Sequence, residues 1–222
     1  MIRTLKSQFG LNIRSHDAYL GQAYRACGKK LKTSMCLDSV YYLADRLSKT
    51  LCYLNTHFDY NYESKGFTWV LRDSAFEGAY GVSTHPNEKV KVLILSMELS
   101  HKKLTSKLSN TQHVYDGEYH IVAERVMDGY SNKTARQNAF TDAIIRHEIG
   151  HILTKTSDVK KVRKWLKLHS KKWWRENVSE YALKDAYEAT AELFSLITSK
   201  TYEFGTLPRK MEALVLNMTS RA

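Results

Sequence analysis

The sequence is poor in the residues that build several common classes of protein. It has only two prolines and ten glycines in 222 residues, few for an all-β or loop-rich design. Its three cysteines, Cys27, Cys36 and Cys52, are widely spaced and form no Cys-x-x-Cys pair, which excludes a disulfide scaffold and a thiolate zinc site. No uninterrupted apolar run approaches the roughly 20 residues of a membrane helix. We therefore expect no membrane partner and a reducing compartment.

The composition does provide a core and a strong positive charge. Apolar residues make up 43% of the chain and aromatic residues 11%, which excludes a disordered or low-complexity segment. The chain has 34 Lys and Arg against 23 Asp and Glu, a net charge of +11. Such a surface favours acidic partners, whether nucleic acid, anionic membrane or acidic protein.

The order of periodic segments predicts an α+β fold. An N-terminal arm is followed by one helix, then by several short β-like runs, and further helices end the chain. The expected strands and helices are therefore segregated along the sequence. The expected elements are an N-terminal arm over 1–33, a helix over 35–57, β-like runs over 66–71, 78–83, 89–95 and 118–126, and helices over 133–154, 157–174 and 179–198 (with Ser179 as N-cap) and after Pro208.

The sharpest motif is His147-Glu148-Ile149-Gly150-His151, an H-E-x-x-H sequence. On a helix, positions i and i+4 lie one turn apart on the same face, so both imidazoles can bind one Zn²⁺. Glu148 lies to the side, where it can take a proton from a water molecule that zinc has acidified. Isoleucines flank the motif, which indicates a buried turn rather than a solvated one.

Two histidines leave zinc short of ligands, and the segment 179–192 offers the missing one. On a continuous helix, four of its polar residues fall within about 40° of one line, with small or apolar residues around them. Inward-facing carboxylates need partners, which a metal and its histidines would supply. Glu188 is the favoured ligand and Glu192 the alternative. The residues on this line are Tyr181, Asp185, Glu188 and Glu192.

The H-E-x-G-H pair followed by Tyr-x6-Glu-x3-Glu resembles the gluzincin zinc peptidases, above all the lethal-factor-like enzymes. The resemblance covers two stretches of the chain. It implies a zincin-like fold, with a small mixed sheet and active-site helix in an upper subdomain over 34–156 and a C-terminal helical subdomain over 157–222.

The same resemblance assigns roles to individual side chains. It makes His147, His151 and Glu188 the zinc ligands and Glu148 the general base. It makes Tyr181 the phenol that stabilises the oxyanion, and Glu192 the carboxylate that orients a ligand histidine. One departure is the sequence Ala189-Thr190-Ala191 between the two late glutamates, where the family usually has aromatic residues. The run 118–126, with His120, is expected to be the sheet edge that receives an extended substrate.

A basic segment over 157–175 separates the two motifs. It holds eight Lys and Arg against the single acidic residue Asp158, and its apolar positions recur at helical spacing. Two interpretations stay open: a packed helix with a solvated lysine face, or a contact with an acidic substrate or nucleic acid.

The sequence therefore predicts a zinc metalloendopeptidase with one Zn²⁺ per chain, acting on a protein or peptide substrate. The alternative is a non-catalytic virion or nucleic-acid-binding protein that retains a zincin fold. Because residues 1–7 show no signal-peptide pattern, we expect a phage or mobile-element protein in the cytoplasm of a bacterial host cell or in the virion.

Overall fold

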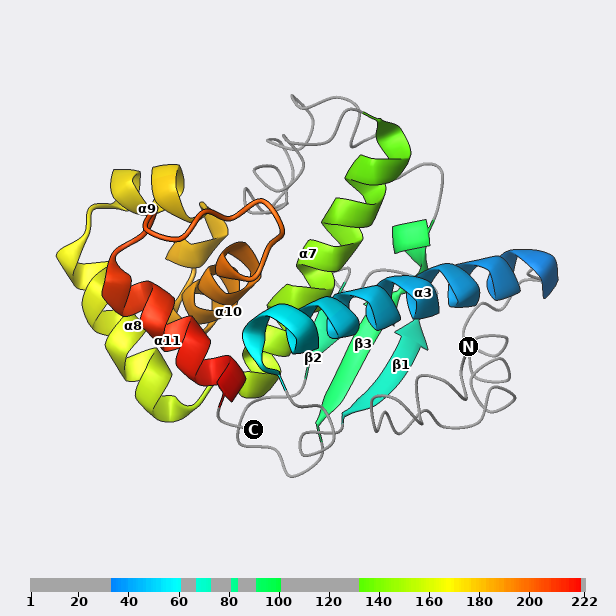
Figure 1. The fold of residues 1–222 in the computed structure, drawn as a ribbon, viewed down its shortest axis with the longest axis horizontal. Helices are drawn as coiled ribbons and strands as arrows, with labels where there is room; N and C mark the ends of the chain where they lie inside the picture. The colour runs from blue at the N-terminus through cyan, green and yellow to red at the C-terminus, as the bar shows by residue number, and fades with distance from the viewer. Residues whose placement is uncertain (1–32, 61–66, 73–80, 84–90, 101–131, 221–222) are drawn as a thin grey trace.

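The computed structural model describes residues 33–60, 67–72, 81–83, 91–100 and 132–220 (Figure 1). Within these ranges the chain is mainly helical and contains one small mixed sheet. The elements in chain order are α3 (Thr33–Phe58), β1 (Thr68–Arg72), β2 (Gly81–Ser83), β3 (Val92–Ser96), the 3-10 turn η1 (Met97–Ser100), α7 (Lys133–Leu153), α8 (Thr156–Leu168), α9 (Lys171–Asn177), the 3-10 turn η2 (Tyr181–Leu183), α10 (Ala186–Ile197) and α11 (Arg209–Ser220).

The three strands pair in the order β1-β3-β2. β3 is parallel to β1, with Thr68 opposite Val92, and antiparallel to β2, with Val82 opposite Ile94. Helix α7 packs against β2 and β3 on one side and against α10 on the other. In Figure 1, α7 therefore runs between the sheet with α3 and the group formed by α8, α9, α10 and α11.

The central helix α7 is fixed by its cap and by burial. The Asn132 side chain accepts a hydrogen bond from the Ala135 amide at 2.8 Å, which satisfies a free N–H of the first turn. From Ala139 to Gly150 every residue is buried. Such a helix can hold polar side chains in its middle only where neighbouring elements supply partners.

Several of the expected elements are found where the sequence placed them. The helix over 35–57, the helix over 133–154 and the helix after Pro208 correspond to α3, α7 and α11. The run 78–83 contains β2, and the runs 66–71 and 89–95 overlap β1 and β3, each of which ends one residue later than expected. The arm over 1–33 and the run 118–126 with His120 lie outside the described residues, apart from Thr33 at the start of α3. No helix among the described residues has the length and apolarity needed to cross a membrane.

Two expected helices are wrong in their boundaries. The segment 157–174 forms two helices, because His169 is extended and Ser170 caps α9 by accepting a hydrogen bond from Trp173 N at 3.1 Å. The segment 179–198 begins with η2, whose Ala182 N–H is bound by Ser179, and α10 begins only after Asp185. Asp185 is the N-cap of α10, with hydrogen bonds from Tyr187 N at 2.7 Å and Glu188 N at 3.0 Å.

Candidate metal centre

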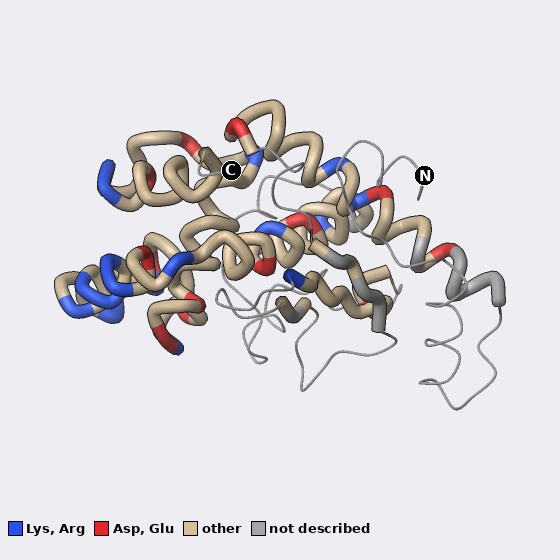
Figure 2. Tube along the Cα trace, turned by 90° about the horizontal axis from the view of Figure 1, so that it is seen from below, with Lys and Arg blue, Asp and Glu red and all other residues tan. Residues whose placement is uncertain are grey.

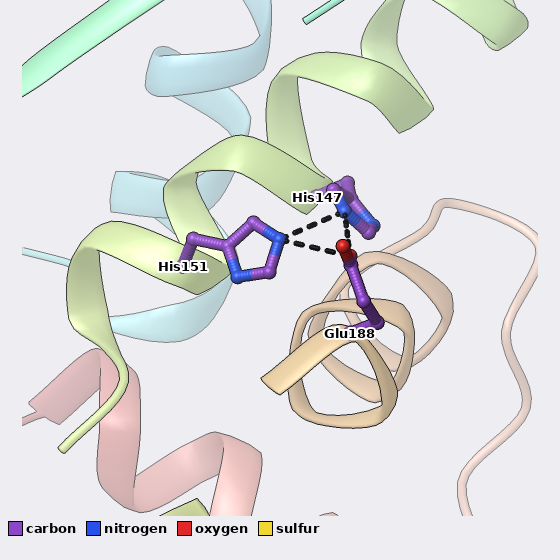
Figure 3. A group of neighbouring side chains, drawn as sticks. All are labelled: His147, His151 and Glu188. Atoms are coloured by element: carbon purple, nitrogen blue, oxygen red, sulfur yellow. Dashed lines mark hydrogen bonds and ion pairs between the residues drawn. The ribbon is translucent and has the colours of Figure 1, made fainter. Parts of the chain in front are cut away.

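The centre lies where α7 and α10 touch. His147 and His151 come from the last turns of α7, and Glu188 comes from the first turn of α10 (Figure 3). The cap at Asp185 decides where that first turn begins, and so aims Glu188 at the histidines. Chain segments about 40 residues apart are thereby joined at one point.

Three atoms at this point form a nearly equilateral triangle. His151 Nε2 lies 3.1 Å from His147 Nε2 and 3.1 Å from Glu188 Oε2, and His147 Nε2 lies 3.2 Å from Glu188 Oε2. A tetrahedral zinc ion with ligand bonds of about 2.0–2.1 Å holds its ligand atoms roughly 3.3–3.4 Å apart. The triangle is thus close to one face of a zinc tetrahedron, and these three residues could together hold a metal ion.

Glu192 fixes which nitrogen of His147 faces the triangle. Its Oε1 lies 2.6 Å from His147 Nδ1, on the opposite side of the ring from Glu188, and Glu192 is only 1% exposed. With Nδ1 turned toward this carboxylate, Nε2 is the nitrogen that faces the triangle and that would bind a metal in place of its proton. The structure thus places Glu188 beside both histidines and Glu192 behind one of them.

The electrostatics of the centre favour a positive charge inside the triangle. Burial would lower the pKa of His147, but its bonds to Glu188 and Glu192 outweigh burial and raise that pKa to about 10. Burial would raise the pKa of Glu188, yet its bonds to His147 and His151 hold that pKa far below the ordinary value. Glu148 adds a further negative charge beside His147. A divalent cation satisfies the same demand.

The second oxygen of Glu188 faces a different pair of groups. Tyr181 Oη donates to Glu188 Oε1 at 3.1 Å, and Lys184 Nζ lies 3.0 Å from Tyr181 Oη and 3.2 Å from Glu188 Oε1. Burial is the main cause of the raised pKa of Tyr181, so the phenol is a proton donor at neutral pH. The two donors hold the outer oxygen, which leaves Oε2 for the histidines.

Sequence reasoning did not single out Lys184. The available signal was its spacing: it stands four residues before Glu188, and such pairs often interact. Tyr181 was expected on the same helix as Glu188, and that expectation is wrong, since Tyr181 belongs to η2. The turn nevertheless brings its hydroxyl to Glu188. The Asp185 side chain is turned to the backbone amides at the start of α10, as its N-cap.

Glu148 is buried between α7 and β2. Its side chain is only 6% exposed, and a Cβ placed on Gly81 would lie 2.8 Å from Glu148 Cγ and 2.8 Å from Ile144 Cγ2. Gly81 therefore leaves the space that Glu148 occupies at the start of β2. Sequence reasoning did not single out Gly81, because strand and helix meet there only through the tertiary fold.

Gly150 sets how closely α7 and α10 approach. A Cβ at this position would lie 3.0 Å from Phe194 Cβ and 3.1 Å from Ala191 Cα. Those neighbours are rooted in the α10 backbone and cannot turn away. The small residues Ala189-Thr190-Ala191, the departure from the gluzincin pattern, are all buried. Ala191 is thus the counterpart of Gly150 in a close helix contact.

Comparison with protein-family models, with curated proteins and with solved structures found no match. The function is therefore inferred from the chemistry of the centre.

Proposed function

We propose that this chain is a zinc metallopeptidase of the gluzincin type with a zincin-like fold. The observation that carries the proposal is the triangle of His147 Nε2, His151 Nε2 and Glu188 Oε2, with edges of 3.1–3.2 Å. Two imidazoles and one carboxylate are the donor set typical of a catalytic zinc, which leaves a coordination position open for reactants. Bound there, zinc would polarise a peptide carbonyl and acidify a water molecule.

The side chains around the triangle supply the remaining chemistry. Glu148 is the base that takes the proton of water and later delivers it to the leaving nitrogen. Tyr181 is the donor that stabilises negative charge on the carbonyl oxygen in the transition state. Glu192 keeps His147 in the tautomer that presents Nε2, and Lys184 keeps the outer oxygen of Glu188 occupied.

The burial of Glu148 supports its role as a base. A carboxylate held against Gly81 and Ile144 cannot swing freely into solvent, so it stays beside the histidines. Positioning of this kind is a large part of enzymatic rate enhancement.

Metal content is the first test. The purified protein should hold about one zinc per chain, measured by mass spectrometry of the metal. His147→Ala and His151→Ala should lose it, and His57→Ala, which alters an exposed histidine of α3, should keep it. Full zinc content in both centre variants would refute the assignment of the site.

Peptidase activity is the second test. Cells that express the wild type are compared with cells that express Glu148→Gln, and new protein termini are counted by mass spectrometry. We expect cleavage sites that depend on Glu148. A protein that holds zinc and cleaves nothing would instead be a non-catalytic protein that retains the metal site.

A further inference from the structure

Lys and Arg residues are concentrated along α8 and at the start of α9 (Figure 2), and their side chains are exposed. Within the described part of the chain, six cations here form no ion pair, whereas Lys172 and Arg175 pair with Glu176 and Glu180. The only acid of α8, Asp158, is fully buried and accepts a hydrogen bond from Lys155 N. We call the six residues the α8–α9 basic face: Lys160, Lys161, Arg163, Lys164, Lys167 and Lys171.

Three of these lysines form a row along α8. At about 100° per residue, Lys160, Lys164 and Lys167 fall within roughly 60° of one line. Like charges three and four residues apart repel each other and destabilise a helix. The row therefore costs stability in the isolated chain and would gain it against a polyanion, whose counterions are released on binding.

The buried side of α8 argues against a membrane as that polyanion. An interfacial helix inserts its apolar face into lipid. Here Val159 and Val162 are 2% and 0% exposed, because that face packs into the protein's own core. Leu168 is the single large apolar residue of α8 that is strongly exposed, at 76%.

A flat aromatic pair lies at the end of the lysine row. The ring of His169 stacks on Trp173 with centroids 4.2 Å apart and planes 25° apart, and both side chains are half-buried. Lys167 precedes His169 by two residues, and Lys171 lies between His169 and Trp173 in the sequence. Leu168 is next to His169. Cations that follow a backbone beside a ring on which a base can stack are the features of sites for single strands. An acidic peptide would need only the cations.

We infer that the α8–α9 basic face binds single-stranded nucleic acid. The lysine row contacts successive phosphates, and a base stacks on the His169–Trp173 pair. Because lysine ammonium groups act as point charges, this binding is independent of base sequence. The inference does not rest on the zinc centre, which lies on α7 and α10.

The test uses the full-length protein and a fluorescein-labelled 20-nucleotide oligothymidylate, with fluorescence anisotropy measured over a range of salt concentrations. The triple variant Lys160→Gln, Lys164→Gln, Lys167→Gln removes the row. The control Lys200→Gln, Arg209→Gln, Lys210→Gln removes the same charge from exposed positions elsewhere. Loss of three phosphate contacts should reduce the slope of log K against log salt by about 2 and weaken binding at least tenfold at low salt. The control should change neither to that extent.

A second variant tests the stacking contact. His169→Ala should weaken oligothymidylate binding several-fold and should affect a duplex of the same length less, because duplex bases are not free to stack on a side chain. The inference is overturned if both triple variants lose binding equally, or if the duplex binds more tightly than the single strand. It is also overturned if polyglutamate or phosphatidylserine vesicles bind as tightly as the oligonucleotide.

Discussion

The successive helices α7 and α8 differ in where their charged side chains lie: those in the second half of α7 are mostly buried, and those of α8 are mostly exposed. In the second half of α7, Arg146, His147 and Glu148 are buried, and His147 and His151 are bonded to carboxylates of α10. Along α8, the cations are exposed, and the six of the α8–α9 basic face form no ion pair within the described residues. The buried histidines have two carboxylates of α10 as partners, whereas the α8–α9 basic face has no anionic partner among the described residues. A buried charged group needs a partner within the protein, because it has lost its hydration. An exposed charged group is solvated by water and is available to pair with a ligand.

The largest expected effect is the loss of catalysis in Glu148→Gln, a variant that leaves the other buried charged residues of α7 unchanged. Glu148→Gln keeps the size of the side chain in the space beside Gly81 and removes only the base. Peptide cleavage should fall by on the order of 10³-fold or more, while zinc content and thermal stability stay near wild type. The rate is measured on a peptide taken from a cleavage site that the terminal analysis identifies. Retained cleavage would mean that another residue is the base.

The next effect separates the two glutamates of α10. Glu188→Gln should weaken zinc binding sharply and abolish cleavage, because Glu188 Oε2 faces both histidines. Glu192→Gln should keep zinc and lower the cleavage rate by about 10–100-fold, as is usual when a residue that orients a metal ligand is lost. Zinc affinity is measured by competition with a chelator. The reverse result, with zinc lost only in Glu192→Gln, would exchange their roles.

Gly150→Ala tests the close contact that brings the two helices together. The added methyl would press on Phe194 Cβ and Ala191 Cα, so α10 must move away by a few tenths of an ångström. The free energy of unfolding should fall by about 1–2 kcal/mol even though alanine is a better helix former. Zinc affinity should fall with it. Denaturation with and without a chelator separates the two effects, since a packing loss persists when zinc is removed.

Tyr181→Phe and Lys184→Gln test the groups on the outer oxygen of Glu188. Tyr181→Phe should lower the rate and leave zinc affinity within a few-fold, since Lys184 still holds Glu188 Oε1. Lys184→Gln should weaken zinc binding by about tenfold or less, because Tyr181 still donates to the same oxygen. Loss of zinc in Tyr181→Phe would show that the phenol acts on the metal site rather than on the transition state.

The smallest expected effect is a gain in stability when one positive charge on the exposed side of α8 is replaced by a negative one. Arg163→Glu replaces repulsion from Lys160 and Lys167 by attraction at spacings of three and four residues. The free energy of unfolding should rise by about 0.5 kcal/mol at low salt, while oligothymidylate binding weakens. The gain in stability should disappear near 1 M salt, where surface charges are screened. A gain that survives high salt would indicate a packing effect and not relief of repulsion.

The helix that carries the H-E-x-x-H motif could be predicted from the sequence because its signals are local. Asn132 is an N-cap three residues before the amide it binds, and the spacing of His147 and His151 depends only on the helical period. The break at Asp185 was not predicted, since Asp185 was read as part of a polar stripe. Its side chain competes for backbone amides, a choice that depends on which conformation the rest of the chain allows.

The sequence by itself determined the residue types of the candidate metal centre, their order along the chain and the strong charge of the segment between them. Only the tertiary structure decided which oxygen of Glu188 meets the histidines, that Glu192 lies behind His147, and that Gly81 and Gly150 leave room for Glu148 and for α10. Helical periodicity places residues around one axis. The distance between two axes depends on side-chain volumes that meet across the core, and those pairs are far apart in the chain.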